Sequence, residues 1–177
     1  PEFSLDLLAP NGAIERLTRD DLAGKVVLID VWATWCEPCK SELEEVSALL
    51  DRYATGSFAD RLRVISLSVD TPDPDNEGTD EEKTAEIRSL VERFLEARNL
   101  QLDRSPIARV AIDPRGETTS ALGIEAIPML VLIDPQGVVR AVHVGAPPRV
   151  IRELAPTLDA MLEAQAPQPG SATGRRP

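Results

Sequence analysis

The segment DVWATWCEPCK, residues 30–40, contains both cysteines of the 177-residue chain, Cys36 and Cys39. Before it, the run VVLIDV over residues 26–31 is apolar except at Asp30. A continuous apolar run of this length is typical of a strand that is buried on both faces. After Cys36, apolar residues recur at helical spacing, which predicts an amphipathic helix over residues 38–53. The two cysteines are therefore expected where a buried strand passes into a helix.

The rest of the chain continues the alternation of strands and helices. A second buried strand, LRVISLSVD over residues 62–70, predicts a right-handed βαβ unit with parallel strands. Hairpins are predicted around Pro10-Asn11-Gly12 and around Pro135-Gln136-Gly137. The other expected elements are helices over about 82–98 and 150–163, a short strand over 107–113 and a short helix ending at Gly123. The pattern predicts an α/β fold with a mixed β-sheet and helices on both faces.

Length and composition suit one folded domain with a tail. We expect a single domain over residues 1–163 and a disordered tail over 164–177, because the tail is rich in Pro, Gly and Ser. Apolar residues make up 42% of the chain, enough for a buried core. The acidic loop over residues 71–82 is interpreted as a solvated segment that could shape partner choice.

Net charge and chain ends bear on partners and location. The net charge of -11 repels phosphate backbones and argues against nucleic acid as a partner. No apolar run approaches the length needed to cross a bilayer. The chain opens Pro1-Glu2-Phe3 without a signal peptide, so we expect a fragment or processed form whose native membrane anchor or leader is missing.

The cysteine pair could be a staple, a metal site or a reactive centre. A disulfide across three residues closes almost no loop, so it would stabilise the fold little by the chain-entropy account. A structural zinc site needs about four ligands, whereas the chain offers two cysteines and one histidine, His143. We therefore expect no metal, and a reactive pair.

A helix start favours redox chemistry at such a pair. Free N–H groups and the positive end of the helix dipole stabilise a thiolate, the nucleophilic form of cysteine. Cys36 is therefore predicted to be the accessible attacking nucleophile. Cys39, one turn further on, is predicted to resolve a mixed disulfide.

The same residues carry a family resemblance. DVWATWCEPCK resembles the active-site segment of thioredoxin-fold proteins, and the Asn-Gly hairpin with the CEPCKSEL continuation is similar to the TlpA/ResA-like membrane-anchored thiol–disulfide oxidoreductases. Over most of the chain, the resemblance implies a thioredoxin fold with an N-terminal β-hairpin extension. It also implies an extracytoplasmic location in the periplasm or cell envelope, no cofactor, and reduction of disulfides in other proteins. Some members of that family serve cytochrome c maturation. The implied partners are protein disulfide substrates and an upstream thiol electron donor, such as a membrane reductase.

The resemblance also assigns residues that bind substrate. The family's matching proline is cis and faces the cysteine pair, which implies a cis Ile127–Pro128 bond. Ile127 would offer backbone groups to an extended substrate peptide, and Trp35 would give an apolar docking surface. Met129 stands where many relatives have Thr, so substrate preference is not carried over.

Acidic residues around the cysteines are predicted to handle protons and to tune the pair. Asp30 interrupts an apolar strand, so burial should raise its pKa and suit it to accept the Cys39 proton. Glu42 lies three residues after Cys39, and the matching Glu in ResA-like proteins influences cysteine protonation. The negative charge of Glu37, between the cysteines, would oppose a thiolate on Cys36 and so make the cysteine pair a better reductant. Pro38 is expected in the first turn of the helix, where it would also tune the redox behaviour of the pair.

Two competing functions remain open at the level of sequence. A thiol peroxidase can share this fold, but such enzymes activate one cysteine with Thr and Arg; Thr34 is present here without a nearby arginine in the sequence. A copper or haem-protein chaperone could use the cysteines as soft ligands, although the chain has no Met/His-rich segment.

Overall fold

A seven-stranded mixed sheet forms the centre of the protein. The computed structural model describes residues 4–9, 13–55, 58–100, 102, 104–145 and 149–165. The strands are β1 (Ser4–Leu8), β2 (Ile14–Thr18), β3 (Val26–Trp32), β4 (Leu62–Ser68), β5 (Ala108–Ile112), β6 (Met129–Ile133) and β7 (Val139–Val144). Their order in the sheet is β2-β1-β5-β4-β3-β6-β7. The predicted α/β fold with a mixed sheet is confirmed.

The strand that precedes the cysteines is in the middle of this sheet. β3 pairs in parallel with β4 and antiparallel with β6. All seven of its residues are buried, as expected for a strand with an apolar run and helices or loops over both faces. The parallel β3–β4 pairing confirms the βαβ unit predicted around the cysteine segment.

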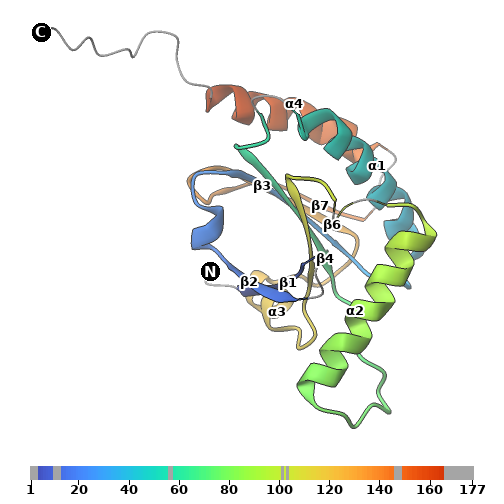
Figure 1. Ribbon diagram of the computed structural model, residues 1–177. Helices are drawn as coiled ribbons and strands as arrows, with labels where there is room; N and C mark the ends of the chain where they lie inside the picture. Colours follow the sequence, from blue (N-terminus) through green and yellow to red (C-terminus); the bar gives the residue numbers. More distant parts are fainter. Residues whose placement is uncertain are drawn as a thin grey trace, which may run out of the picture.

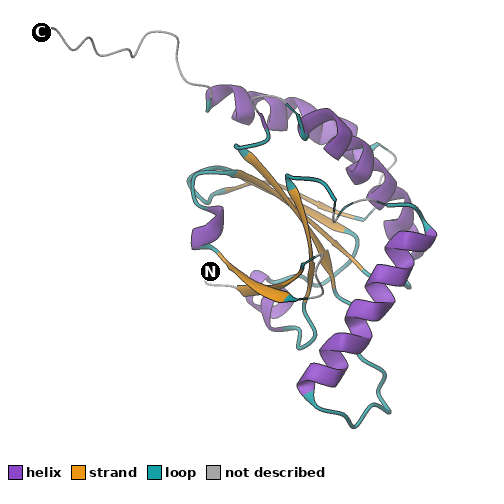
Figure 2. Cartoon of the chain, viewed as in Figure 1, coloured by secondary structure: helices purple, strands orange, loops and turns teal. Residues whose placement is uncertain are grey.

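Most of the helical mass lies on one face of the sheet. The helices are η1 (Asp20–Leu22), α1 (Glu37–Tyr53), α2 (Asp80–Ala97), α3 (Glu117–Leu122) and α4 (Val150–Ala164). Figures 1 and 2 show α1, α2 and α4 together on one side of the strands, where their buried side chains share one core cluster. Leu22 of η1 and Ile124, just after α3, pack against the opposite face. The site therefore has a rigid layer behind it.

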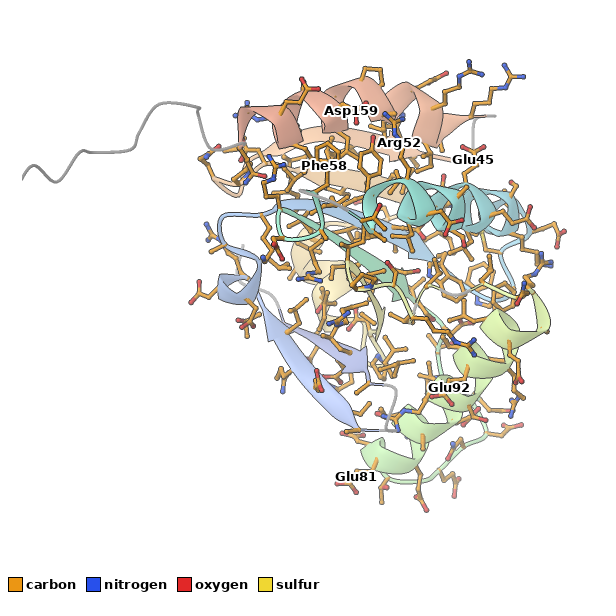
Figure 3. The ribbon with its side chains drawn as sticks, turned by 45° about the horizontal axis from the view of Figure 1, so that its top comes forward. Glu45, Arg52, Phe58, Glu81, Glu92 and Asp159 are labelled. Atoms are coloured by element: carbon orange, nitrogen blue, oxygen red, sulfur yellow. A yellow bond between two sulfur atoms is a disulfide. The ribbon has the colours of Figure 1, made fainter. Side chains whose placement is uncertain are left out.

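Polar contacts join α1 to α4 along the outside of that layer. Arg52 Nη2 donates to Asp159 Oδ2 at 2.8 Å, and the Tyr53 hydroxyl donates to Asp159 Oδ1. Figure 3 shows Arg52 and Asp159 on the neighbouring helices. Glu45 accepts from the backbone N–H groups of Arg149 and Ile151, at the start of α4. These contacts hold the helix that carries the cysteines against its neighbour.

Element boundaries differ from the predictions in a few places. β1 and β2 pair antiparallel, which confirms the first hairpin, whereas its predicted Pro10-Asn11-Gly12 turn lies outside the described residues. α2 begins two residues earlier than predicted, because Thr79 and Glu82 form a capping box ahead of it. η1 was not predicted, since three residues carry no helical periodicity.

The described residues begin at Ser4 and end at Gln165. α4 extends to Ala164, and Gln165 donates to the Gly24 carbonyl at 2.8 Å. The rest of the predicted tail, residues 166–177, lies outside the described residues. Among the helices that are described, none has both the length and the apolar character to cross a bilayer.

Candidate active site

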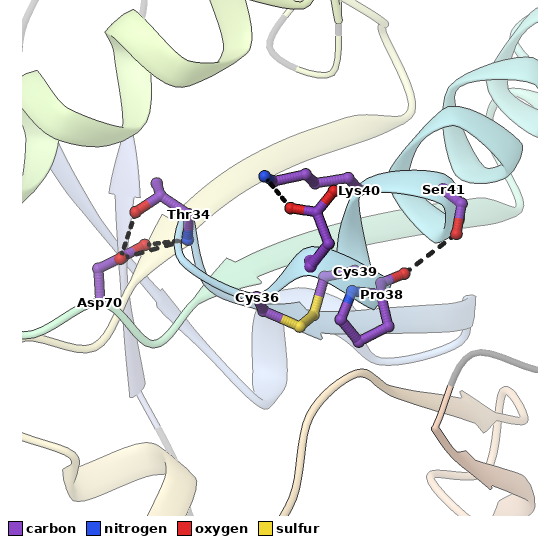
Figure 4. Close-up of a disulfide and its surroundings, with 8 residues drawn as sticks. Thr34, Cys36, Pro38, Cys39, Lys40, Ser41 and Asp70 are labelled. Carbon is purple, nitrogen blue, oxygen red and sulfur yellow. Dashed lines mark hydrogen bonds and ion pairs between the residues drawn. A yellow bond between two sulfur atoms is a disulfide. The ribbon is translucent and has the colours of Figure 1, made fainter.

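The two cysteines form a disulfide at the start of α1. Cys36 is the N-cap residue, and Glu37 and Pro38 occupy the first turn. The Cys36 and Cys39 Cα atoms are 5.3 Å apart, within the usual range for a disulfide. Figure 4 shows this bond at the mouth of the helix. The predicted position of the pair, between a buried strand and a helix, is confirmed.

The two sulfurs are not equally reachable. Cys36 is 5% exposed and Cys39 is 0% exposed. Cys36 is thus far less accessible than the sequence indicated, because the disulfide ties its side chain to the buried Cys39. The small exposure that remains belongs to Cys36, so of the two cysteines only this residue reaches the surface.

A buried carboxylate holds the loop that leads into Cys36. Asp70 accepts hydrogen bonds from the Thr34 backbone N–H at 3.0 Å and from the Thr34 hydroxyl at 2.7 Å (Figure 4). The Ser68 hydroxyl donates to the same carboxylate at 2.8 Å. These bonds fix the turn between β3 and α1, and with it the position of the N-cap cysteine.

Glu37, the first of the two residues between the cysteines, is exposed, as predicted, but its charge is paired. Glu37 forms an ion pair with Lys40 on the next turn of α1 (Figure 4). The Lys40 ammonium hydrogen-bonds Glu37 and lowers the pKa of this carboxyl. The pairing offsets part of the negative charge that Glu37 places next to Cys36.

The proline segment lies beside the cysteines through the sheet register. The Ile127–Pro128 bond is cis, as the resemblance implied. Met129, the next residue, pairs with Val31 near the end of β3, so Pro128 lies at the edge of the sheet from which α1 departs. Pro128 is buried and Ile127 is half-buried. Trp35 is 70% exposed next to Cys36, so an apolar surface borders the disulfide.

Two buried carboxyl groups lie behind the cysteines. Asp30 of β3 is 0% exposed and Glu42 of α1 is 2% exposed. Burial raises the pKa of Asp30 well above its usual range, and the nearby charge of Glu42 raises it further. Burial raises the pKa of Glu42 to about 7, and the charge of Glu45 acts in the same direction. Two such groups facing each other cannot both ionise easily, so they hold a proton near neutral pH.

Asp30 and Glu42, which we call the acid pair, receive few hydrogen bonds from the rest of the protein. Asp30 Oδ1 and both carboxyl oxygens of Glu42 are buried without a hydrogen-bond partner among the described residues. Glu42 follows Cys39 by three residues, so the two side chains leave the same side of α1. The structure thus brings Asp30 and Glu42 together in the interior, with Glu42 on the same helix as the fully buried Cys39.

Sequence reasoning missed the polar side chains of β4. Ser66 receives a hydrogen bond from Trp32 Nε1 at 2.7 Å, and Ser68 contacts Asp70. Both serines are fully buried. A signal was present, because Ser66 and Ser68 interrupt the apolar run LRVISLSVD at alternate positions and so share one face of the strand. In the part of the chain that is described, no group of three or more His, Cys, Asp or Glu residues could hold a metal ion.

A Cys-x-x-Cys disulfide at the start of a helix, after the central strand of a mixed sheet and beside a cis-proline, defines a thioredoxin-fold protein. A family model described as the AhpC/TSA family matches residues 1–142, and the chain belongs to this family.

Relatives of known sequence are named as redox proteins of this fold. The chain is 28% identical over 145 residues to the thioredoxin-like protein YneN of Bacillus subtilis, covering 82% of this chain and 69% of that protein. It is 32% identical to the thiol:disulfide interchange protein DsbE of Xylella fastidiosa strain 9a5c, covering 82% and 59%. The thiol-disulfide oxidoreductase ResA of Oceanobacillus iheyensis is 25% identical, with 82% and 63% covered. The chain spans 59% to 69% of the length of these relatives.

Solved structures agree with the predicted thioredoxin fold. The DsbE thiol:disulfide interchange protein from Chlorobium tepidum superposes with a TM-score of 0.64 at 27% identity, over 92% of this chain and 94% of that one. StoA from Bacillus subtilis superposes with a TM-score of 0.55 at 19% identity, over 82% and 90%. The resemblance to ResA-like proteins is confirmed by these similarities.

Proposed function

We propose that this chain is a thiol–disulfide oxidoreductase that reduces disulfides in other proteins through Cys36 and Cys39. The observation that carries the proposal is the Cys36–Cys39 disulfide at the start of α1, in which Cys36 keeps a small exposure and Cys39 is fully buried. The names of the relatives, which include thiol:disulfide interchange proteins and thiol-disulfide oxidoreductases, support it.

The proposed reaction is exchange through a mixed disulfide. In the dithiol form, the Cys36 thiolate attacks one sulfur of a substrate disulfide, so a Cys36–substrate bond forms and the substrate bond breaks. The released substrate sulfur takes up a proton. Cys39 then loses its proton to the Asp30–Glu42 pair and attacks Cys36, which frees the second substrate thiol and regenerates the disulfide seen in the structure. The substrate gains two electrons and the cysteine pair loses two.

Other residues are proposed to bind and tune. Trp35 offers an exposed apolar surface, and Ile127 before the cis-proline offers backbone groups to an extended peptide. Glu37 and Pro38 adjust the redox balance from the first turn of α1. The proposed setting is extracytoplasmic, with a thiol donor such as a membrane reductase returning electrons. Apocytochromes c, which contain a Cys-x-x-Cys-His motif, are the proposed substrate class.

Trapping tests this function directly. A Cys39→Ser variant in the reduced form is mixed with a synthetic peptide that carries an oxidised Cys-x-x-Cys-His motif, and with oxidised insulin as a general protein disulfide. We expect a mixed disulfide at Cys36, seen by mass spectrometry, with faster trapping of the Cys-x-x-Cys-His peptide. A Cys36→Ser variant, the matched control, should trap neither. If the reduced wild-type chain leaves both disulfides intact, the proposed function is wrong.

The same preparation discriminates the competing functions. Peroxide consumption that needs Cys36, without disulfide reduction, would favour a thiol peroxidase. The Thr34 hydroxyl is engaged by Asp70, so Thr34 is poorly placed to activate a peroxide on Cys36. Stoichiometric retention of copper(I) without disulfide reduction would favour a metal chaperone.

A further inference from the structure

We propose that Ser66 is a positioning residue for the proton transfer at Cys39, because its hydroxyl selects and stabilises the charged form of Asp30. The inference rests on the proposed function. It adds Ser66 to the site, which so far consists of the cysteines, the buried carboxyl groups and the cis-proline segment. Ser66 touches neither cysteine, and it would act only through Asp30.

The sheet register brings the two residues together. Asp30 of β3 and Ser66 of β4 are direct neighbours in the parallel pairing. Both are fully buried. Trp32 Nε1 donates to Ser66 Oγ at 2.7 Å, and Ser66 Oγ donates to Asp30 Oδ2 at 3.5 Å. A short polar chain therefore runs from the indole to the carboxyl group inside an otherwise apolar layer.

The direction of this chain follows from the donors. An indole N–H can only donate, so the Ser66 oxygen must accept from Trp32. The single hydrogen of the Ser66 hydroxyl is then directed to Asp30 Oδ2. Asp30 Oδ2 is thereby kept as an acceptor, so a proton on Asp30 belongs on Oδ1, the oxygen without a hydrogen-bond partner among the described residues.

The bond is long in the disulfide form, and charge would strengthen it. A separation of 3.5 Å exceeds the usual O–H···O distance. Hydrogen bonds to an ionised acceptor are shorter and stronger than those to a neutral one. The hydrogen bond from the Ser66 hydroxyl would therefore stabilise Asp30 most strongly once Asp30 has given up its proton and become a carboxylate.

That moment belongs to reduction of the disulfide. When a reductant thiolate attacks Cys36, a new sulfur–sulfur bond forms to the reductant, and the Cys36–Cys39 bond breaks. Cys39 leaves with the electron pair and takes a proton from the Asp30–Glu42 pair, which gains one negative charge. In the reverse direction, the Cys39 thiol returns the proton to the pair as it attacks Cys36.

Few other groups offset this charge. Glu42 faces Asp30 from α1, and Glu45 acts on Glu42. From the β6 side, the cross-strand neighbour of Asp30 is the apolar Leu130, and beyond it His143 of β7 lies on the same face, two strands away. α2 contributes the Phe94 ring, which stacks on Trp32. Among the described groups that act on Asp30, Ser66 is the one that favours ionisation.

The experiment compares three full-length variants. Ser66→Ala removes the hydroxyl, and Ser66→Thr keeps it. Ser68→Ala removes an equally buried hydroxyl from the same face of β4 that contacts Asp70 and not Asp30. Carboxyl titrations of Asp30 and Glu42 are followed by carbon-13 NMR in the disulfide form. The rate of disulfide reduction by dithiothreitol is measured over the same pH range.

In Ser66→Ala, we expect the Asp30 titration to move to higher pH by roughly one unit, a tenfold change in proton affinity. The pH profile of reduction should move with it, while Ser66→Thr and Ser68→Ala titrate like the wild type. An unchanged titration in Ser66→Ala, or an equal shift in either other variant, would overturn the proposal. The titration needs no turnover, so it tests the role of Ser66 even if the chain fails to reduce protein disulfides. Such a failure would contradict the proposed function and not the role of Ser66.

Discussion

Burial of Glu42 makes the stability of the folded chain depend on pH. The pKa of Glu42 in the folded chain is raised from 4.5 to about 7, mainly by burial. The folded state thus binds this proton more tightly than the unfolded chain does. The resulting stability is fully present below about pH 4.5 and is lost as the pH rises through about 7.

A Glu42→Gln substitution should therefore stabilise the protein at alkaline pH. We expect its free energy of unfolding at about pH 8 to exceed that of the wild type by roughly 2–3 kcal/mol, and to match the wild type near pH 5. Urea denaturation of the disulfide form at both pH values measures this. Glu44→Gln, an exposed position on the same helix, should change stability little at either pH. A Glu42→Gln variant that is destabilised at pH 8 would contradict the account.

Trp35 should matter for protein substrates but not for folding. Its side chain is 70% exposed, so truncation removes little buried area. We expect Trp35→Ala to leave the Tm nearly unchanged and to lower kcat/KM for a protein disulfide by about tenfold, the loss of about 1.4 kcal/mol of docking. The rate with dithiothreitol should be unaffected, because a small thiol needs no docking surface. Equal losses with both substrates would show a damaged disulfide instead.

Contacts between site residues could be predicted where the two residues are near in sequence. Cys39 and Glu42 lie three residues apart on α1, directly after the N-cap Cys36, so their spacing alone predicted that they share one side of the helix. Ser66 reaches Asp30 only through the strand register, which no local pattern shows. The low exposure of Cys36 was also missed, because it depends on the state of the disulfide and not on the composition of the segment.

At the scale of elements, α2 owes its start to a few side chains. The Thr79 hydroxyl accepts from the Glu82 N–H at 3.3 Å, and the Glu82 carboxylate accepts from the Thr79 N–H at 2.7 Å. Neighbouring contacts from Asp73 and Asn76 to Glu86 fold the acidic loop back onto the helix. The loop is mostly exposed, in agreement with the interpretation as a solvated segment, and it is also hydrogen-bonded to its own helix.

Thr79→Ala should cost the protein about 1 kcal/mol of stability, the usual value of a lost N-cap. Its disulfide exchange rate should remain that of the wild type, because the cap is on an acidic loop and contacts no residue of the site. Thermal unfolding and insulin reduction measure the two effects. Glu92→Gln, on the exposed side of the same helix (Figure 3), is the control. A drop in exchange rate with Thr79→Ala would link this loop to substrate binding.

Most of the helices and strands were predictable because local sequence patterns indicate them. The helix of the cysteines and the buried strands on either side have strong apolar periodicity, and the β6–β7 hairpin is marked by its turn. The order β2-β1-β5-β4-β3-β6-β7 is a property of the whole chain. The βαβ pattern predicted the parallel β3–β4 neighbours, but no local pattern indicated the order of the other strands, because their pairing depends on contacts distant in sequence.

At the scale of the whole molecule, the acid pair links redox state to global stability. Reduction replaces a neutral disulfide by two thiols, one of which, Cys39, is fully buried on the same helix as the buried Glu42. The helix start favours a thiolate only at Cys36. We therefore expect the dithiol form to gain little electrostatic stabilisation, which would favour the disulfide form and make the protein a reductant.

The disulfide form should accordingly unfold at a higher temperature than the dithiol form. A difference of about 1–2 kcal/mol would appear as a Tm higher by roughly 2–8 °C for a domain of this size. The reduction potential should lie near the value of thioredoxin, about -270 mV, and far below the value of about -120 mV for a strong oxidant. Calorimetry of both forms and equilibration with defined thiol–disulfide buffers measure the two quantities, which are linked because folding and reduction form one thermodynamic cycle. A Cys36→Ser/Cys39→Ser variant should not respond to redox buffer. If the dithiol form proves the more stable, the chain donates disulfides instead of removing them.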